Sequence, residues 1–497
     1  MQLSISFSAL LAGMLVALSA SEVQAVPVAQ APKMVTLPIK RMGSPASDLH
    51  PEILLQQKIN HASKRLALMS GREAPTDAMM QDALRKRVLA IEGEEGVERR
   101  FNRWQVPPKS QQAKRFNRWK VPNQPTKRRA GGNKAAASLA AAGSAIGGPD
   151  SAVGVQVANT PTTANSLALN NETPDIGYLA TVQMGTPPQN FLILMDSGSA
   201  DLWVASESCV STTGGNCGKH LTLGATSSTS FAASNTPFQV TYGTGAVQGL
   251  LVQDDVSIAG LTLKAHTFGA TLQETVQFTD DSVPFDGLMG LAQSTLSQQQ
   301  TLTPVEALAK QGSITEAITS YKISRAADGL NDGEITFGGL DATKFNKATL
   351  TTVPNVNTQG FWEAAVDSFT VDGKDSGLAG RTAILDTGTT LIVAPVSDAT
   401  AIHALIQGSA STGNGGFTIP CNFNQTIALT VGKTSFAIDP RDMVVSQPNA
   451  QGVCSSGISG GSFGTSNTEW LVGDVFLKNA YYSTDVGKNT VSLAKLV

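Results

Sequence analysis

Two short motifs in this 497-residue chain carry the side chains with the clearest chemical potential. Leu192-Ile-Leu-Met-Asp196-Ser-Gly-Ser199 is an apolar run that ends in a carboxylate, and Arg381-Thr-Ala-Ile-Leu-Asp386-Thr-Gly-Thr389 repeats it 190 residues later. Burying an unpaired carboxylate is costly, so an Asp at the end of an apolar strand needs hydrogen-bond donors of its own. The glycine two residues after each Asp permits a tight turn whose amides can face the carboxylate, and the hydroxyl three residues after it can orient the outer oxygen.

The repetition indicates two related halves that each contribute one carboxylate. An apolar strand follows each motif, at 202–204 and 391–393, and each half later carries an apolar-apolar-glycine triplet, at 288–290 and 471–473. Two carboxylates held together cannot both ionise easily and therefore share a proton. One can then act as a base on a water while the other acts as an acid on a substrate carbonyl. A single Asp-Ser-Gly or Asp-Thr-Gly is more often a turn or a cap, but the duplication favours a catalytic pair.

Short strands must position these motifs. From Asp175 onward, β-rich runs alternate with Gly, Asn and Asp turns, at 178–184, 191–195, 238–242, 249–258, 334–337 and 361–371. Helical patterns are few, and the clearest are 304–311 and 396–406. The low charged fraction of 15% and the 47 glycines also favour a turn-rich protein. The pattern predicts a mostly β body of about 320 residues, with the site between its two halves.

The first 172 residues differ in composition from this body. Residues 1–25 combine an apolar stretch, too short and interrupted for a membrane span, with a small-residue cleavage site, as in a secretory signal peptide. Within 26–129, apolar residues recur at helical spacing over 55–69 and 80–91, so we expect two amphipathic helices with basic outer faces. Residues 130–172 are rich in Ala, Gly, Ser, Thr and Asn, which predicts a low-complexity linker.

A duplicated basic motif lies between the helices and the linker. Arg-Phe-Asn-Arg-Trp-(Gln/Lys)-Val-Pro occurs at 100–107 and again at 115–122, with dibasic sequences at 99–100, 114–115 and 127–129. In an exported chain such pairs are candidate sites for a kexin-type processing protease, although a solvated basic tract is the simpler alternative. Excision at these pairs would release two similar peptides, beginning at Phe101 and Phe116, and would make the chain a dual precursor.

Charge is distributed unequally along the chain. Residues 1–129 hold 21 Lys and Arg against 10 Asp and Glu, a net charge of +11, whereas the remaining residues carry −14. Opposite charges on consecutive segments indicate that the segments contact each other. A basic arm for nucleic acid is the alternative, which the export signal disfavours. With no second apolar stretch of membrane length and no lipid-anchor signal, we expect no membrane anchor.

The cysteines favour disulfides rather than a metal site. Cys209, Cys217, Cys421 and Cys454 are an even number in an exported chain, and no two have Cys-x-x-Cys spacing. Three pairings are open, of which the local one, Cys209–Cys217 with Cys421–Cys454, is the simplest. The five His show no metal spacing and no Gly-rich phosphate loop precedes a helix, so neither a metal nor a cofactor is expected.

From about residue 175 to 497 the chain resembles the pepsin-like aspartic endopeptidases of fungal secreted type. Besides the two Asp motifs, Tyr242-Gly-Thr-Gly245 is similar to the flap hairpin of that family, and the blocks at 285–292, 361–368 and 470–476 match family blocks. The resemblance implies a bilobal acid protease fold with two pseudo-symmetric, β-barrel-like lobes, at 173–345 and 346–497, and a cleft between them. The cysteine positions resemble two of the disulfides of the animal enzymes, and the third is absent.

The resemblance also implies roles for single residues. Asp196 and Asp386 would be the catalytic pair, and Tyr242 would close over the substrate with Trp203 supporting its hydroxyl; both aromatics could otherwise be ordinary strand residues. Thr244 stands where fungal relatives that accept Lys beside the scissile bond carry Asp. We therefore expect the substrate to have large hydrophobic residues around the scissile bond. The stretch 278–283 is more acidic than the apolar wall expected at that point. The residues supporting the carboxylates would be Gly198, Ser199, Gly388 and Thr389, and the remaining flap and substrate-binding residues Gly243, Gly245, Phe285 and Leu288.

A zymogen is a further implication. The basic segment 26–129, whose opening Leu37-Pro-Ile-Lys-Arg41 is similar to fungal propeptides, would cover the acidic enzyme, with a basic side chain capping the carboxylates until acid weakens the contact. The expected partners are polypeptide substrates, the propeptide as an intramolecular inhibitor and pepstatin-type inhibitors, on a monomer. We expect secretion, with the vacuole as alternative, and glycosylation at Asn171 or Asn424. A catalytically silent binding or inhibitor protein on the same fold is the competing interpretation.

Overall fold

The computed structural model of the chain describes residues 34–38, 40–42, 50–69, 73–101, 155–156, 171–172 and 177–497, apart from 244, 282, 331, 450 and 462–467. The predicted signal peptide, the duplicated motif beyond Phe101 and most of the predicted linker lie outside the described residues.

Most of the described elements are strands, as the sequence predicts. The strands are β1 (Val35–Pro38), β2 (Lys40–Met42), β3 (Val155–Gln156), β4 (Asn171–Glu172), β5 (Gly177–Met184), β6 (Gln189–Asp196), β7 (Leu202–Ser211), β8 (Thr222–Leu223), β9 (Ala232–Thr241), β10 (Ala246–Ile258), β11 (Leu261–Glu274), β12 (Gly287–Gly290), β13 (Ile318–Lys322), β14 (Glu334–Phe337), β15 (Thr351–Pro354), β16 (Glu363–Val366), β17 (Ser368–Val371), β18 (Lys374–Asp375), β19 (Arg381–Leu385), β20 (Ile392–Pro395), β21 (Ala410–Gly413), β22 (Gly416–Pro420), β23 (Ile427–Val431), β24 (Thr434–Ile438), β25 (Val453–Ser455), β26 (Ile458–Gly461), β27 (Glu469–Val472), β28 (Tyr481–Asp485) and β29 (Thr490–Ala494). The α-helices are α2 (Pro51–Met69), α3 (Asp77–Phe101), α5 (Val276–Thr279), α6 (Pro304–Lys310), α7 (Val396–His403), α8 (Pro440–Met443) and α9 (Asp474–Leu477), and short 3₁₀ turns cover Ser294–Leu296, Ala326–Asp328 and Lys347–Thr349. None of the described helices is long and apolar enough to cross a membrane.

The expected strands and helices are confirmed with one exception. The single strand expected over 361–371 is wrong, because the chain forms β16 and β17 there, on either side of Asp367. β16 pairs with β19 and β17 with β23, so the two strands belong to different sheets. The helix expected at 304–311 begins with a reciprocal cap, in which Glu306 accepts from the Thr303 amide at 2.9 Å and Pro304 occupies the first turn.

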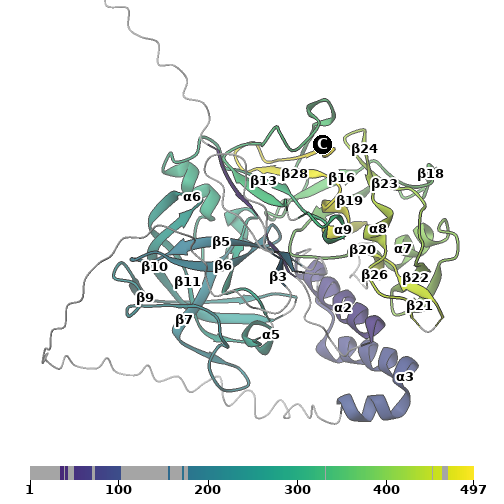
Figure 1. Cartoon of the computed structure of the whole chain (residues 1–497), viewed down its shortest axis with the longest axis horizontal. Coiled ribbons are helices and arrows are strands. Elements are labelled where there is room, and N and C mark those ends of the chain that lie inside the picture. Colours follow the sequence, from purple (N-terminus) through teal and green to yellow (C-terminus); the bar gives the residue numbers. More distant parts are fainter. Residues whose placement is uncertain are drawn as a thin grey trace, which may run out of the picture.

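The body has two lobes joined by a shared sheet. The N-terminal lobe, teal in Figure 1, is built on a nine-stranded sheet that includes β5, β6, β12, β7, β11, β10 and β9. The C-terminal lobe, green to yellow, contains a five-stranded sheet in the order β16-β19-β27-β20-β26 and two smaller ones. A six-stranded sheet in the order β1-β14-β13-β28-β29-β15 draws strands from both halves of the chain.

The two Asp motifs occupy equivalent positions in the two lobes. β6 ends at Asp196 and runs parallel to β12, while β19 ends one residue before Asp386 and runs parallel to β27. The glycine of each downstream triplet lies where another part of the backbone crosses: a Cβ on Gly290 would lie 2.5 Å from the backbone of Ala200, and one on Gly473 would meet the carbonyl of Thr389. Only glycine permits these crossings, which explains why each half carries one at this point.

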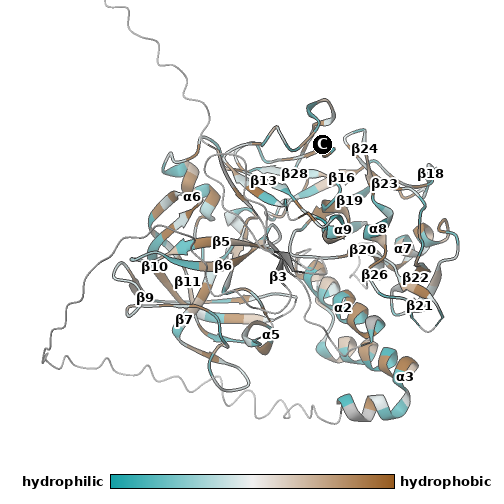
Figure 2. Cartoon of the chain, in the orientation of Figure 1, coloured by the Kyte–Doolittle hydropathy of each residue, from teal (hydrophilic) through white to brown (hydrophobic). Residues whose placement is uncertain are grey.

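The segment 34–101 packs on both lobes. β1 pairs antiparallel with β14 at the edge of the six-stranded sheet, and β2 pairs with β5 of the N-terminal lobe. α2, purple in Figure 1, packs against the C-terminal lobe, and α3 lies beyond it near β21 and β22. Brown and teal residues alternate around α2 in Figure 2, consistent with an amphipathic helix. Its apolar side chains form one buried cluster with side chains of the C-terminal lobe: Leu55, Ile59, Ala62, Leu66 and Met69 pack with Phe361, Ile384, Leu391, Val393 and Leu471.

Candidate active site

Each Asp carboxylate is held by its own motif. The amide of Gly198 donates to Asp196 Oδ1 at 2.9 Å, and the Ser199 hydroxyl donates to Oδ2 at 2.6 Å. The second motif repeats both bonds at the same lengths, from the Gly388 amide and the Thr389 hydroxyl to Asp386. Both Asp side chains are fully buried. These four donors offset the cost of burying charge, as the sequence predicts for a carboxylate at a strand end.

The middle residues of the motifs bind the two lobes together. The Ser197 amide donates to the Thr387 hydroxyl and the Thr387 amide donates to the Ser197 hydroxyl, each at 3.0 Å. Each hydroxyl then donates across to a main-chain carbonyl of the opposite strand, Ser197 to Leu385 and Thr387 to Met195. This reciprocal network fixes the two motifs relative to each other. Neither residue is among the site residues predicted from the sequence, although both middle positions carry a hydroxyl.

The two carboxylates face each other across the lobe boundary. A Cβ on Gly198 would lie 2.5 Å from Asp386 Oδ1, and one on Gly388 would lie 2.5 Å from Asp196 Oδ1. Each glycine therefore supports the carboxylate of the opposite lobe, so that a larger residue at either position would displace it. The arrangement can perform paired acid–base chemistry on one substrate atom.

One guanidinium of α2 lies between the carboxylates. Arg65 donates from Nη2 to Asp196 Oδ1 at 2.5 Å and to Asp386 Oδ1 at 2.9 Å, and from Nε to Asp386 Oδ2 at 2.5 Å. The Arg65 side chain is 14% exposed. The family resemblance implies a basic side chain at this place without identifying it. The sequence contains a clue to this residue. Arg65 lies three residues after Ala62 and four before Met69, so this charged side chain falls on the apolar side of the helix.

Burial and charge act in opposite directions at this centre. Burial and the neighbouring Asp196 raise the pKa of Asp386, while Arg65 acts to lower it. Burial disfavours the charged form of Arg65, but Asp196 and Asp386 together outweigh it and raise the Arg65 pKa. The guanidinium therefore stays charged and stabilises the ionised carboxylates, which opposes the shared proton that acid–base chemistry requires.

The predicted flap lies over Asp196 and packs on α2. Tyr242 is buried, and its hydroxyl accepts from Trp203 Nε1 at 2.8 Å. A Cβ on Gly243 would lie 2.6 Å from the His61 carbonyl, so this part of the flap touches α2 directly. A Cβ on Gly245 would meet the Thr275 hydroxyl at the base of the flap. Thr244 lies outside the described residues.

The wall behind the flap is aromatic rather than acidic. Phe278 makes edge-on contacts with Trp203, Tyr242 and Phe285, with ring centroids 5.4, 5.7 and 6.2 Å apart. Leu288 belongs to the same buried cluster. The acidic side chains of 278–283 point to solvent instead, and Asp281 pairs with Lys219 at 2.9 Å. Although 278–283 is more acidic in sequence than the apolar wall expected at that point, Phe278 of this stretch supplies apolar surface to the cluster.

Part of the cleft stays open beside α2. A cavity of about 800 Å³ adjoins Arg65 and Met69 and lies between the lobes. The N-terminal lobe contributes Gly198–Asp201 and the flap residues Gln239–Gly243, and the C-terminal lobe contributes Gln359 and Phe361. α2 thus fills only one portion of the groove that contains the two carboxylates.

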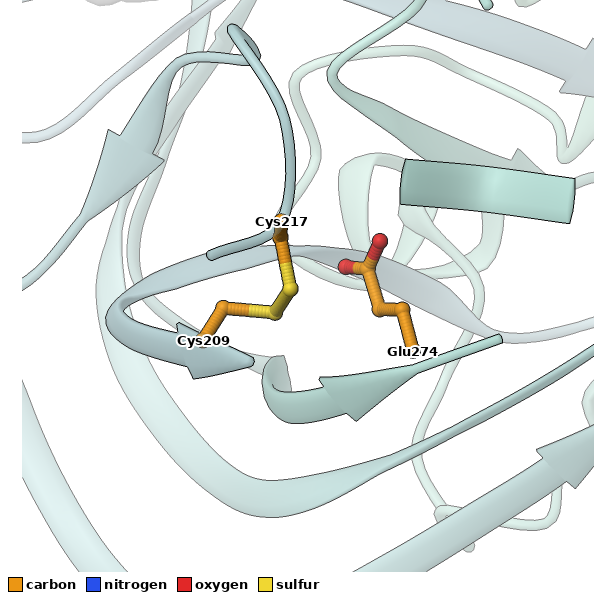
Figure 3. Close-up of side chains that lie close together, drawn as sticks. All are labelled: Cys209, Cys217 and Glu274. Carbon is orange, nitrogen blue, oxygen red and sulfur yellow. A yellow bond between two sulfur atoms is a disulfide. The ribbon is translucent and has the colours of Figure 1, made fainter. Parts of the chain in front are cut away.

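The disulfides follow the local pairing. Cys209–Cys217 closes a short loop in the N-terminal lobe and Cys421–Cys454 a longer one in the C-terminal lobe, with Cα atoms 5.5 and 5.0 Å apart. Glu274 lies against the first disulfide (Figure 3). Within the described part of the chain this is the one group of three potential metal ligands, but its sulfurs are bonded to each other, so no thiolate is available to a metal.

The two predicted glycosylation sites differ in what the structure describes. Asn424 is exposed between β22 and β23. The side chain of Asn171 lies outside the described part of β4.

The chain is similar to known aspartic proteases over the bilobal body. A family model described as eukaryotic aspartyl protease matches residues 177–496. The probable aspartic-type endopeptidase CTSD of Trichophyton verrucosum is 36% identical over 340 residues, which cover 68% of this chain and 65% of the relative. The aspartic-type endopeptidase ctsD of Aspergillus fumigatus is 35% identical over 68% of this chain and 70% of the relative, and rhizopuspepsin of Rhizopus chinensis is 34% identical over 64% and 78%. The chain thus spans about two thirds of the length of the Trichophyton relative.

Proposed function

This chain belongs to the eukaryotic aspartyl protease family, and we propose that it is an aspartic endopeptidase that hydrolyses peptide bonds in proteins at acid pH. The observation that carries this proposal is the contact of one guanidinium with both Asp196 and Asp386. A single small group can reach the two carboxylates at once, so a water or a peptide carbonyl can do the same.

The proposed reaction needs the site without Arg65 and with one proton on the pair. The ionised carboxylate takes a proton from a water, whose oxygen attacks the peptide carbonyl carbon, while the protonated carboxyl gives its proton to the carbonyl oxygen. The resulting tetrahedral diol returns a proton through the pair to the peptide nitrogen, and the C–N bond breaks to leave a carboxylic acid and an amine. Charges, protons and atoms balance with water as the only co-reactant.

The segment 34–101, called the pro segment below, is in this proposal an intramolecular inhibitor. Arg65 occupies the position of the reacting groups and donates hydrogen bonds to both carboxylates, while α2 lies against the flap at Gly243. Acid protonates the carboxylates and weakens this contact, so the enzyme is made as a zymogen. Among the predicted processing sites, the pair at 99–100 ends α3, where Glu92 holds the Arg100 guanidinium. Proteolysis favours exposed, poorly structured chain, which disfavours processing at this helical pair. The dibasic sequences at 114–115 and 127–129 lie outside the described residues and stay predictions from sequence.

Large hydrophobic residues are the proposed preference around the scissile bond. Two observations support this. The wall near Asp196 consists of Tyr242, Phe278 and Leu288 among others. Immediately beside Arg65, the pro segment itself inserts Leu66 and Met69 among apolar side chains of the C-terminal lobe. Apolar substrate side chains would replace these contacts when the segment leaves.

We also propose that the protein is secreted, with the vacuole as the alternative location, and that it acts as a monomer on protein substrates. Pepstatin-type compounds are the proposed inhibitors. The duplicated peptides of a dual precursor lie outside the described residues beyond Phe101 and remain a prediction from sequence.

Cleavage of denatured haemoglobin or casein at about pH 3.5 tests the activity, measured with and without pepstatin. We expect pepstatin-sensitive cleavage by the processed chain and none by Asp196→Asn. If the wild-type and Asp196→Asn chains behave identically after the pro segment has gone, the chain is the silent binding protein of the competing interpretation.

A further inference from the structure

A second arginine of the pro segment is buried against the enzyme, outside the catalytic groove. Arg87 of α3 has a side chain only 3% exposed. Its Nη1 donates to the Thr412 carbonyl at 3.2 Å and its Nη2 to the Gly413 carbonyl at 3.0 Å, both on the β21–β22 hairpin of the C-terminal lobe. Within the pro segment the same two nitrogens donate to Glu52 at 3.2 Å and to Gln56 at 3.3 Å.

The hairpin is shaped to receive a guanidinium. Gly413, Asn414 and Gly415 all adopt positive φ, of 76°, 48° and 78°, so the turn between the strands is tightly coiled behind the two carbonyls. A Cβ on Gly416 would lie 2.8 Å from Arg87 Nη2, so a larger residue there would crowd the guanidinium. We call the carbonyls of Thr412 and Gly413, bounded by Gly416, the arginine cradle.

We propose that the arginine cradle is a second anchoring site for the pro segment, selective for a guanidinium, which holds α3 on the enzyme independently of the ionisation of Asp196 and Asp386. The inference rests on the proposed function, in that it concerns the regulation of the same active site. A guanidinium can satisfy two carbonyls and two side-chain acceptors from one planar group, whereas a Lys ammonium is a point charge that cannot match this geometry.

The two anchors differ in the groups that face them. Arg65 faces Asp196 and Asp386, both of which titrate. On the enzyme, Arg87 faces main-chain carbonyls, which do not titrate. Among the residues that the structure describes, the titratable group paired with Arg87 is Glu52, which belongs to the pro segment and accepts from the side-chain amide of Asn449 of the enzyme at 3.0 Å.

Acid therefore weakens the first anchor and leaves the contacts of Arg87 with the two main-chain carbonyls of the enzyme. The consequence is a state in which the catalytic groove is open while α3 is still docked on the C-terminal lobe. A return to neutral pH then re-forms the inhibited state from the same molecule, because the segment has not diffused away.

Hydrogen exchange of α3 in the full-length chain tests the proposal. Asp196→Asn with Asp386→Asn at neutral pH imitates the protonated pair and prevents self-digestion. In this background we compare Arg87→Ala with Arg87→Lys and with the matched control Arg85→Ala, an exposed position two residues earlier on the same helix. We expect α3 to stay protected in the background and in the control, and its amides to exchange about 10- to 100-fold faster in Arg87→Ala. Arg87→Lys should lie between the two.

Two outcomes would overturn the proposal. One is exchange of α3 in Arg87→Ala within about twofold of the Arg85→Ala control. The other is loss of α3 protection in the double Asn background alone, which would mean that docking depends on the ionised pair. Hydrogen exchange of β5 and β6 reports whether the enzyme is folded in every variant. If Arg87→Ala speeds exchange there as well, the α3 exchange rate of Arg87→Lys is compared with the Arg85→Ala control instead. Failure of the proposed function shows separately, as absent pepstatin-sensitive cleavage by the wild-type chain.

Discussion

Replacement of Arg65 by Gln is the most direct perturbation of the contact between α2 and the two carboxylates. Gln keeps a polar side chain on α2 but removes the charge and the three short bonds to Asp196 and Asp386. We expect the full-length Arg65→Gln chain to cleave peptide at a mildly acid pH at which the wild-type chain is latent.

The structure bounds the size of the effect. Removing one partner of a buried ion pair costs about 3–5 kcal/mol, mainly because the other charge is left unpaired. Here the two carboxylates can relieve the repulsion by taking up a proton, so the lower limit applies. A loss of about 3 kcal/mol multiplies the fraction of chains with an open groove by roughly 150. The direction with pH follows from the same contact: the Arg65 charge opposes the rise that burial and Asp196 cause in the pKa of Asp386, so the contact favours the ionised Asp386 and weakens as that carboxylate takes up a proton at lower pH.

The assay is the initial rate of hydrolysis of a fluorogenic peptide by the intact chain at about pH 5.5, inhibited by pepstatin and read before any processing is visible on a gel. Arg65→Lys should give an intermediate rate, because one ammonium retains the charge but cannot bridge both carboxylates with the same geometry. The exposed Arg85→Ala serves as control. Equal latency of Arg65→Gln and the wild-type chain would refute the reasoning, since occlusion by α2 would then suffice without the ionic contact.

Three further predictions concern the enzyme body. Burial raises the pKa of Glu274 to about 7, so the stabilisation that protonated Glu274 contributes is lost as the pH rises from about 4.5 to 7. Glu274→Gln should therefore raise the thermal unfolding temperature at pH 8, by the equivalent of up to about 3 kcal/mol, and should not raise it at pH 4. Trp203→Phe removes the donor to the Tyr242 hydroxyl and should lower kcat/KM about tenfold, measured with a peptide substrate, with no further loss on adding Tyr242→Phe. Replacing Cys421 and Cys454 by Ser opens a loop with a sequence separation of 33 and should lower the unfolding free energy in guanidinium by about 4 kcal/mol.

The close pairing of Asp196 and Asp386 could be predicted from the sequence because its determinants are local. Each Asp, its glycine and its hydroxyl residue lie within four positions, and the repeat of that pattern supplied the two-lobed arrangement. Most strands were predictable for the same reason, since alternation and turn residues set them. The exception over 361–371 arose because an apolar run does not reveal that the chain changes sheets at Asp367.

Contacts between distant segments were harder to predict. Charge indicated that the basic segment covers the enzyme, but not that Arg65 reaches the carboxylates and Arg87 the β21–β22 hairpin. Both arginines interrupt the apolar side of an amphipathic helix, which places them against whatever that side covers. Phe278 was hard to predict for a different reason. This one aromatic side chain makes the wall apolar, but the average composition of 278–283 is acidic and hides its effect.

The place of β1 in the six-stranded sheet makes the pro segment part of the folded architecture as well as the proposed inhibitor. Leu37 of β1 is 1% exposed within the main core cluster, and β1 supplies the edge partner of β14. When the segment leaves, β14 loses a row of main-chain hydrogen bonds and the core loses a leucine. The mature chain should therefore persist because unfolding is slow, and should refold from denaturant in lower yield than the full-length chain. Maturation would then be irreversible with respect to folding, because the mature chain would lack the strand that pairs with β14 when the sheet forms.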